Sequence, residues 1–156
     1  MQTETERDVV ISEAEWEVMR VVWANQEVTS RDVINVLHRK MDWKESTIKT
    51  LMGRLVDKEA LNTRREGRAF IYSANISEEN TVKHYSSAML ERVCDQKNGL
   101  VLQHLVKDAT LSQSDIETLI AQLEEKMENA PEIVPCNCVP GQCDCHLIAD
   151  VDEMDW

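Results

Sequence analysis

Apolar residues recur every three or four positions in three successive stretches of the first 60 residues, which predicts three amphipathic helices. The first spans 12–25 and starts with a capping box formed by Ser12 and Glu15. The second starts near Ser30, and the third covers about 46–59. The residues expected to be buried are Ala14, Val18, Val21 and Val22 in the first helix, Val33, Val36, Leu37 and Met41 in the second, and Ile48, Leu51, Leu55 and Val56 in the third.

The periodicity changes after the third helix. The stretch LNTRREGRAFIYSA, residues 61–74, contains two short extended runs around Glu66-Gly67, which predicts a β-hairpin with a tight turn. Three helices followed by a hairpin is the order of a winged helix-turn-helix domain, a DNA-binding fold. We therefore expect such a domain over 8–75 and a fold that is mainly α with a small β-hairpin wing.

The exposed face of the third helix is small, polar and basic, which suits contact with base edges and phosphates in the major groove. The hairpin adds three arginines placed to meet the flanking phosphates. Alone, each element also fits a solvated helix face or an ordinary charged turn, but their combination in this order favours DNA binding. The candidate contacts are Ser46, Thr47, Lys49, Thr50 and Arg54 on the helix and Arg64, Arg65 and Arg68 on the hairpin.

Residues 76–130 predict a second region made of acidic helices, at about 77–96, 99–108 and 111–129. The last helix starts at Ser112, with Asp115 three residues later, and then carries an apolar stripe. Three such helices bury little on their own, so we expect a homodimer that covers them and presents two reading helices to successive DNA half-sites. The stripe consists of Ile116, Leu119, Ile120, Leu123 and Met127.

The charge distribution supports this division. The chain of 156 residues has a formal net charge of −12, which taken alone argues against a nucleic-acid partner. Residues 76–156 carry nearly all of it, with a net charge of −11. Residues 38–72 contain nine basic and five acidic side chains, a local excess of positive charge where the DNA contacts are predicted.

Composition sets the broad class of protein. Hydrophobic residues make up 42% of the chain, which is enough for a folded core. The N-terminal sequence has no signal-peptide pattern, and no apolar run approaches the length of a membrane span, so we expect a cytoplasmic protein. In a reducing compartment, clustered cysteines are more often metal ligands than disulfides.

Such a cluster lies near the C-terminus, in a tail over 131–156 in which Pro131 and Pro135 break the helical pattern. The sequence CNCVPGQCDC has two CxC pairs on either side of a Pro-Gly turn, so four sulfurs can converge. Four thiolates suit zinc(II) in a closed tetrahedral site and equally suit the soft ion copper(I). Disulfide formation is the alternative, and His146 is either a spare ligand or a bystander. The four predicted metal ligands, called the hook below, are Cys136, Cys138, Cys143 and Cys145.

The remaining candidate residues are less specific. Cys94 stands alone on the predicted helix 77–96, and we interpret it as a small packing residue. The sequence shows no Ser/His/Asp order, no glycine-rich phosphate loop and no recognisable motif of paired carboxylates. An enzyme is therefore not expected.

The stretches ISEAEWEVMRVVW, VTSRDVINVL and WKESTIKTLMGRLVDKEAL resemble the penicillinase-repressor and copper-repressor family of winged-helix proteins. The tail is similar to the CxCxxxxCxC pattern of the copper-responsive branch, the CopY type. The resemblance implies a zinc-loaded homodimeric repressor on an inverted-repeat operator of copper-export genes, released when copper(I) displaces zinc at the hook. It adds Lys44 to the candidate DNA contacts and a copper-donating chaperone to the candidate partners.

The sequence leaves alternatives open. Relatives inactivated by proteolysis are cleaved at an Asn-Phe bond in the dimer region, whereas the one phenylalanine here, Phe70, follows Ala69 and lies in the predicted wing, so this route is not expected. A cytosolic copper/zinc buffer would need no basic reading face, and a repressor with purely structural zinc would show no specific copper response. One departure from the family is Lys58-Glu59-Ala60, where relatives have glycine after the lysine, so the third helix must end differently.

Overall fold

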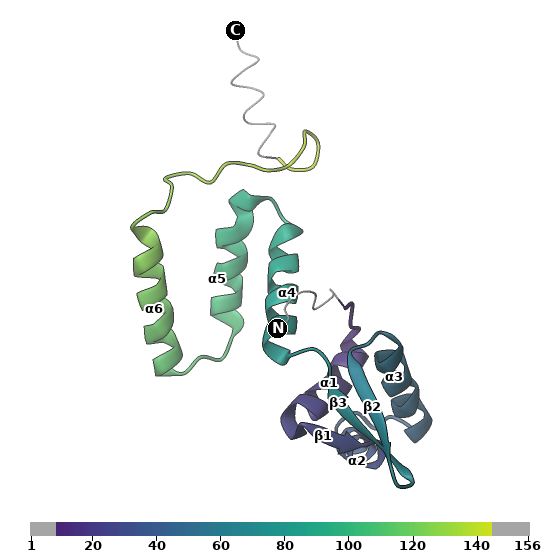
Figure 1. Cartoon of the computed structure of the whole chain (residues 1–156). Helices are drawn as coiled ribbons and strands as arrows, with labels where there is room; N and C mark the ends of the chain where they lie inside the picture. Colours follow the sequence, from purple (N-terminus) through teal and green to yellow (C-terminus); the bar gives the residue numbers. More distant parts are fainter. Residues whose placement is uncertain (1–8, 145–156) are drawn as a thin grey trace. The chain divides into compact units, whose positions relative to one another are not determined.

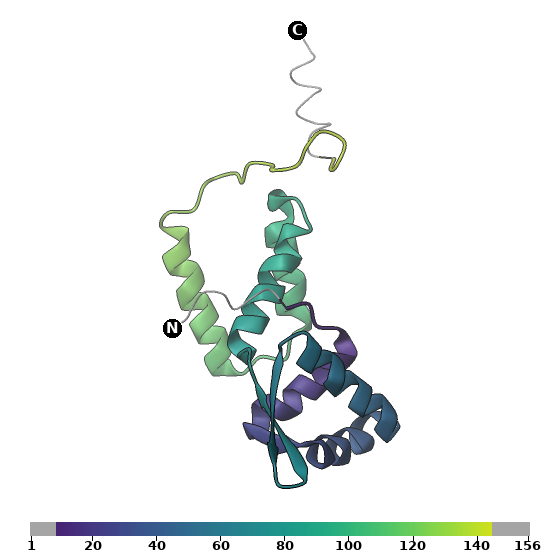
Figure 2. The ribbon, with the colours of Figure 1, turned by 45° about the vertical axis from the view of Figure 1, so that its right-hand side comes forward.

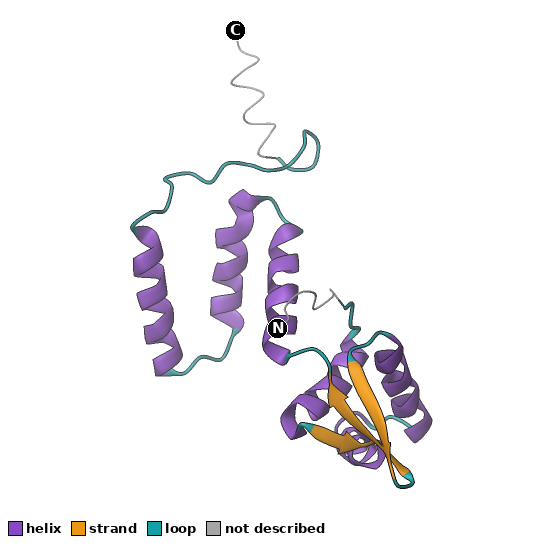
Figure 3. Ribbon diagram, in the orientation of Figure 1, coloured by secondary structure: helices purple, strands orange, loops and turns teal. Residues whose placement is uncertain are grey.

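The computed structural model describes residues 9–144 and divides the chain into two compact units, Met1–Tyr85 and Ser86–Trp156, which are considered separately. Figures 1 and 3 show the helices and strands. In order they are α1 (Glu13–Asn25), β1 (Glu27–Thr29), α2 (Ser30–Met41), α3 (Glu45–Asp57), β2 (Leu61–Glu66), β3 (Ala69–Ala74), α4 (Glu78–Glu91), the 3₁₀ helix η1 (Asp95–Lys97), α5 (Asn98–Asp108) and α6 (Gln113–Met127). Within residues 9–144, no helix is both long enough and apolar enough to cross a membrane.

The first two helices start at capping boxes, in which side chains accept hydrogen bonds from backbone amides that have no partner within the helix. The side chain of Ser12 accepts a hydrogen bond from the Glu15 amide and that of Glu15 accepts one from the Ser12 amide, which confirms the predicted capping box of α1. Thr29 and Asp32 form the same reciprocal pair at the start of α2. Both helix starts are therefore set by residues adjacent in the sequence.

The sheet is antiparallel, with strand order β1-β3-β2. The predicted hairpin is confirmed: Glu66 pairs with Ala69, and Gly67 in the turn has a positive φ of 64°. The turn projects beyond the helices of the first unit in both views (Figures 1 and 2). Strand β1 was not predicted, because its three residues are too few to show a period of two.

The core of the first unit joins the three helices to the base of the hairpin. Most predicted core positions are buried, but the prediction for α2 was wrong at Val36, which is 45% exposed. Ile34 takes its place, because the buried stripe of α2 runs through Val33, Ile34 and Leu37 rather than one residue further on. Ala14, Met41 and Val56 pack at the edge of the core and are partly buried.

The end of α3 shows how the chain turns without the family's glycine. Glu59 adopts the left-handed conformation, with φ 65°, that glycine would adopt more easily. The Glu59 amide donates to the Val56 carbonyl at 3.0 Å and the Ala60 amide to the Leu55 carbonyl at 2.9 Å, the two bonds of a Schellman motif. The Asn75 side chain donates to the Glu59 carbonyl at 2.9 Å and fixes this turn against the end of β3.

This strained turn gives a first prediction. We expect Glu59→Gly to raise the free energy of unfolding by about 1 kcal/mol, since a residue with a Cβ pays that much in the left-handed region. Thermal unfolding of both proteins measures the change. Glu59→Ala is the control: it removes the same carboxylate but keeps the Cβ, and an equal gain in this variant would contradict the explanation.

The start of α4 belongs to the first unit. The Tyr85 hydroxyl donates to the Ile11 carbonyl at 3.1 Å and accepts from the Ile11 amide at 2.6 Å. The Tyr85 ring also packs edge-on against Trp16, with ring centroids 5.0 Å apart. The Trp23 indole donates to the Ile76 carbonyl at 2.8 Å. These contacts attach the segment that follows β3, including the start of α4, to α1 and to the residues just before it.

The second unit contains helices that leave many apolar side chains exposed in the part of the chain that the structure describes. In α5 and α6, which run in opposite directions (Figure 1), no residue is buried. Ser112 and Asp115 form the predicted capping box of α6. The first acidic helix is shorter than predicted: α4 ends at Glu91, and a 3₁₀ turn replaces the last residues of the predicted 77–96 helix. The exposed apolar residues are Leu100, Leu102, Leu105 and Val106 of α5 and Ile116, Ile120, Leu123 and Met127 of α6.

Candidate DNA-binding surface and thiol cluster

A partly buried ion pair holds the C-terminal end of α3. Lys58, the C-cap of α3, donates to Glu15 and, at 2.8 Å, to the Val10 carbonyl. Burial tends to raise the pKa of Glu15, which is 2% exposed, but the Lys58 hydrogen bond and charge and the Ser12 capping bonds outweigh it and lower the pKa. The same carboxylate therefore caps α1 and anchors the end of α3.

All nine candidate DNA contacts are exposed. Lys44 is the N-cap of α3 and makes no side-chain capping bond, while Thr50 donates back to the Ser46 carbonyl at 2.9 Å. Glu45, which sequence reasoning did not single out, lies among these residues and forms ion pairs with Lys49 at 3.1 Å and Arg31 at 3.4 Å. The Lys49 hydrogen bond and the two positive charges lower the pKa of Glu45. Exposed pairs of this kind contribute only about 0–1 kcal/mol, so exchanging the carboxylate for a phosphate costs little.

The three wing arginines are not equivalent. Arg64 makes two hydrogen bonds to Glu27, at 2.8 and 3.2 Å, and one to Glu66 at 3.0 Å, so its charge is already matched and it ties the hairpin to β1. The Arg65 guanidinium lies 5.6 Å from the centre of the Phe70 ring, a cation–π distance. Among the described residues no ion pair of Arg65 or Arg68 is found. Of the three candidate phosphate contacts of the hairpin, Arg65 and Arg68 are therefore the two whose charge no carboxylate of the described residues pairs with.

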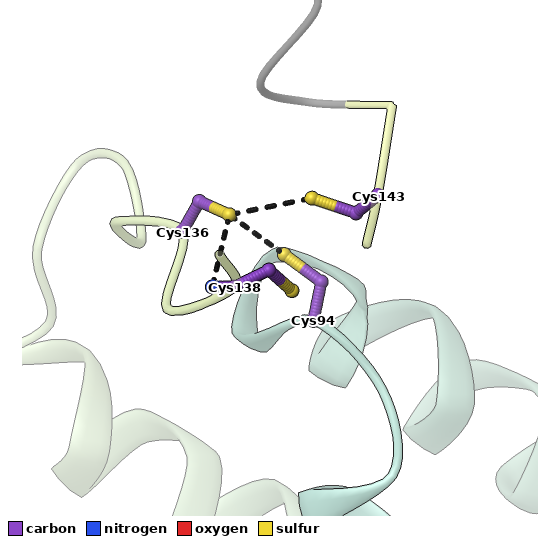
Figure 4. Close-up of side chains that lie close together, drawn as sticks. All are labelled: Cys94, Cys136, Cys138 and Cys143. Carbon is purple, nitrogen blue, oxygen red and sulfur yellow. Dashed lines mark hydrogen bonds between the residues drawn. The ribbon is translucent and has the colours of Figure 1, made fainter. Parts of the chain in front are cut away.

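Four thiols of the second unit converge to form a thiol cluster, defined by Cys94, Cys136, Cys138 and Cys143 (Figure 4). Their sulfur atoms all lie within 4.8 Å of one another, and no disulfide joins these four residues. The Cys136 sulfur is central: it lies 3.5 Å from the Cys94 sulfur and 3.4 Å from the Cys143 sulfur, and it accepts the Cys138 amide at 3.4 Å. Figure 4 shows the side chains pointing toward one another from two segments far apart in the sequence.

The donor set fits a four-coordinate thiophilic cation. Zinc–sulfur bonds of about 2.3 Å place the sulfurs of a tetrahedral site about 3.8 Å apart, close to the separations found here. Burial, together with hydrogen bonds to the Cys143, Cys94 and Cys136 thiols, raises the pKa of the Cys138 thiol to about 12. Thiolates are the form that binds a metal, so metal binding at this cluster would be coupled to the release of the thiol protons.

The segment that carries the hook is held by contacts other than sulfur. The Asp95 amide donates to the Asn137 side chain at 2.9 Å, and the Gln96 side chain donates to the Val134 carbonyl at 2.9 Å. Lys97 lies 3.9 Å from the Asp144 carboxylate. The 3₁₀ helix η1 therefore forms a polar docking edge for residues 134–144.

The structure bears on the predicted metal ligands in three ways. Cys136, Cys138 and Cys143 come together, as the Pro-Gly turn between the CxC pairs predicts. Cys145 and His146 lie outside the described residues. The interpretation of Cys94 as a solitary packing residue on a helix was wrong: α4 ends before it, and Cys94, 5% exposed, joins the thiol cluster from the N-cap of η1. Sequence spacing gave no signal for this, because 42 residues separate Cys94 from Cys136.

Comparison with known proteins settles the family. The family model described as penicillinase repressor matches residues 11–125, which include the winged domain and nearly all of α4 to α6. The chain belongs to the penicillinase repressor family. Members of this family are transcriptional repressors, and the first unit is accordingly its DNA-binding winged-helix domain.

Individual relatives extend along most of the chain. A 16.5 kDa protein of Latilactobacillus sakei encoded in the ptsI 3′ region is 47% identical over 86% of this chain and 92% of its own. The penicillinase repressor of Bacillus licheniformis is 37% identical over 78% of this chain and 95% of its own. Among solved structures, that of the CopR repressor aligns with 44% of this chain and 99% of its own, at 40% identity and a TM-score of 0.38. The family match ends before residue 126, so it does not include the hook.

Proposed function

We propose that this member of the penicillinase repressor family is a metal-sensing repressor: a zinc-loaded homodimer that binds an inverted-repeat operator of copper-export genes and leaves it when copper(I) displaces zinc. The observation that carries the proposal is the convergence of Cys136, Cys138 and Cys143 with a fourth thiol in a unit that follows a DNA-binding domain. Such a thiol set is selective for soft and borderline cations, zinc(II) and copper(I) among them.

The switch must work through geometry rather than charge. One zinc(II) on four thiolates leaves a local charge of about −2, and two copper(I) ions on four thiolates leave the same charge, by the ligand counts of such sites. Electrostatic repulsion from DNA phosphates therefore does not change between the two states. The required coupling is small, since about 1–3 kcal/mol changes the operator affinity roughly 5–150-fold.

The homodimer is supported by the uncovered apolar residues of α5 and α6. Leu105 and Leu123, 56% and 58% exposed, belong to groups of exposed apolar residues on the two helices, and such groups, unlike single exposed residues, mark interaction surfaces. A second copy with two-fold symmetry would cover both helices and present two α3 helices to half-sites about one DNA turn apart. A copper-donating chaperone would be a further partner of the same cysteine-rich tail.

The test is a titration of the zinc-loaded protein with copper(I) in the presence of operator DNA, with released zinc measured in the same sample. We expect DNA binding to be lost in step with zinc release, near two copper ions per chain, because four thiolates accommodate two copper(I) ions. Random DNA of equal length is the control for specificity.

The other outcomes separate the competing functions. A copper/zinc buffer would bind operator and random DNA equally weakly. A repressor with purely structural zinc would lose DNA binding when a chelator removes zinc and would show no response specific to copper. Zinc release with unchanged operator binding would rule out the hook as the switch.

A further inference from the structure

We infer that Cys94 is the fourth zinc ligand, with Cys136, Cys138 and Cys143, so that the metal joins the tail to the junction between α4 and α5. The inference deepens the proposed function and rests on it for the role of copper. The chain has five cysteines, whereas a tetrathiolate zinc site takes only four ligands.

Position favours Cys94 as a ligand. Its sulfur lies 3.5 Å from that of Cys136, within the cluster whose four sulfurs span no more than 4.8 Å. The residue precedes η1 in an extended conformation, with φ −59° and ψ 139°, so its place is set by the backbone between two helices rather than by a helix face.

The docking edge supports the assignment independently of sulfur. The bonds from Asp95 to Asn137 and from Gln96 to Val134 lie on both sides of Cys136 in the sequence of the tail. Both donors directly follow Cys94. These neutral hydrogen bonds place residues 134–137 beside Cys94 without any contribution from sulfur. The Cys94 and Cys136 thiols therefore meet because the backbone brings them together.

A ligand at position 94 changes what a bound metal can control. A site made only from the hook would close a loop within residues 136–145 and constrain only the tail. A site that includes Cys94 closes a loop of about 42 residues, which contains all of α5 and α6. Metal binding at Cys94 therefore constrains the helices that carry the exposed apolar residues, and the cost of loop closure is borne by the metal–thiolate bonds.

Copper(I) then acts by exchanging one ligand. If copper(I) binds at the four hook cysteines, as the proposed function has it, with sulfurs shared between two ions, Cys94 is the thiolate that it leaves behind. Cys94 takes up one proton as Cys145 releases one, zinc(II) leaves as two copper(I) ions enter, and the total charge is conserved. The tail loses its bond to the α4–α5 junction, and the helices lose the constraint.

The experiment replaces zinc by cobalt(II) in the full-length protein and records the sulfur-to-cobalt charge-transfer absorption, which scales with the number of thiolate bonds. We expect Cys94→Ala to lower this absorption and to weaken zinc binding at least about tenfold. Cys145→Ala is the comparison variant and should retain the wild-type cobalt spectrum. The reverse pattern, with loss in Cys145→Ala and none in Cys94→Ala, would overturn the assignment.

A second measurement on the unmodified protein guards against misfolding of the variants. Zinc-loaded protein is alkylated and the modified residues are identified by mass spectrometry, before and after addition of copper(I). We expect zinc to protect Cys94 and leave Cys145 reactive, and copper to reverse both. Protection of Cys145 with modification of Cys94 in the zinc form would refute the inference, even if copper still releases the operator. If copper does not release operator DNA, the proposed function fails while the cobalt spectrum still decides the ligand.

Discussion

Lys58→Met is expected to lower the free energy of unfolding by about 3 kcal/mol at neutral pH. The substitution leaves the Glu15 carboxylate, 2% exposed, buried without its cation. Removing one partner of a buried ion pair costs about 3–5 kcal/mol of stability. We expect the lower value because the Lys58 side chain is 35% exposed, so water reaches it in the native pair. Chemical denaturation at constant temperature measures the loss.

The matched control is Lys40→Met. Lys40 forms an ion pair of 2.7 Å with Glu17, but these side chains are 47% and 24% exposed, so the loss should stay below about 1 kcal/mol. The double variant with Glu15→Gln should recover part of the stability lost in Lys58→Met. Equal losses in the two lysine variants would contradict a special role for Glu15.

The effect of pH has a definite sign. Because the native environment lowers the Glu15 pKa from its ordinary value of 4.5, its contribution is complete above that value and is lost as the pH falls through the lowered native pKa. Without Lys58, burial should instead raise the pKa, so protonation stabilises the variant. The difference in stability between the two proteins should therefore shrink on acidification, and a constant difference between pH 7 and pH 4 would contradict this account.

Leu123→Glu is expected to convert the proposed dimer to monomer and to reduce operator affinity about 10²–10⁴-fold, since each winged domain would then bind its half-site alone. The leucine is 58% exposed in the single chain, so the chain's own fold loses little. In a two-fold dimer the change occurs twice, and two leucines contribute about 3–6 kcal/mol, or about 10²–10⁴ in the dimer dissociation constant. Light scattering and operator binding measure the two effects.

Glu124→Gln is the control for Leu123→Glu, because this neighbouring residue is exposed and lies off the apolar stripe. It should leave both the mass and the operator affinity unchanged. A Leu123→Glu protein that remains dimeric would show that α6 does not form the interface.

The parts of the fold that were predictable from sequence are those set by neighbouring residues. The capping boxes at Ser12 and Ser112 fix two helix starts from four-residue patterns, and the turn at Gly67 fixes the hairpin. What could not be predicted depends on distant pairing. Strand β1 exists because β3 offers it partners, and Val36 lies outside because the core selects the adjacent stripe.

The thiol cluster shows the same division. The convergence of Cys136, Cys138 and Cys143 follows from two short spacings around a turn and was predicted. The addition of Cys94 was not, because it requires the end of α4 and the docking of the tail on η1, and neither leaves a mark in the local sequence. Charge composition likewise did not show that Glu27 and Glu66 already neutralise Arg64 on the wing.

The carboxylate of Glu15 joins two helix ends that are more than 40 residues apart in the sequence. Opening the first turn of α1 or the last turn of α3 separates this carboxylate from one of its partners, so we expect the amides of both turns to exchange together, as one cooperative unit. Helix ends normally fray and exchange fastest. We instead expect the C-terminal end of α3, the candidate DNA-contacting helix, to exchange as slowly as the core, because the Glu15–Lys58 ion pair fixes its orientation.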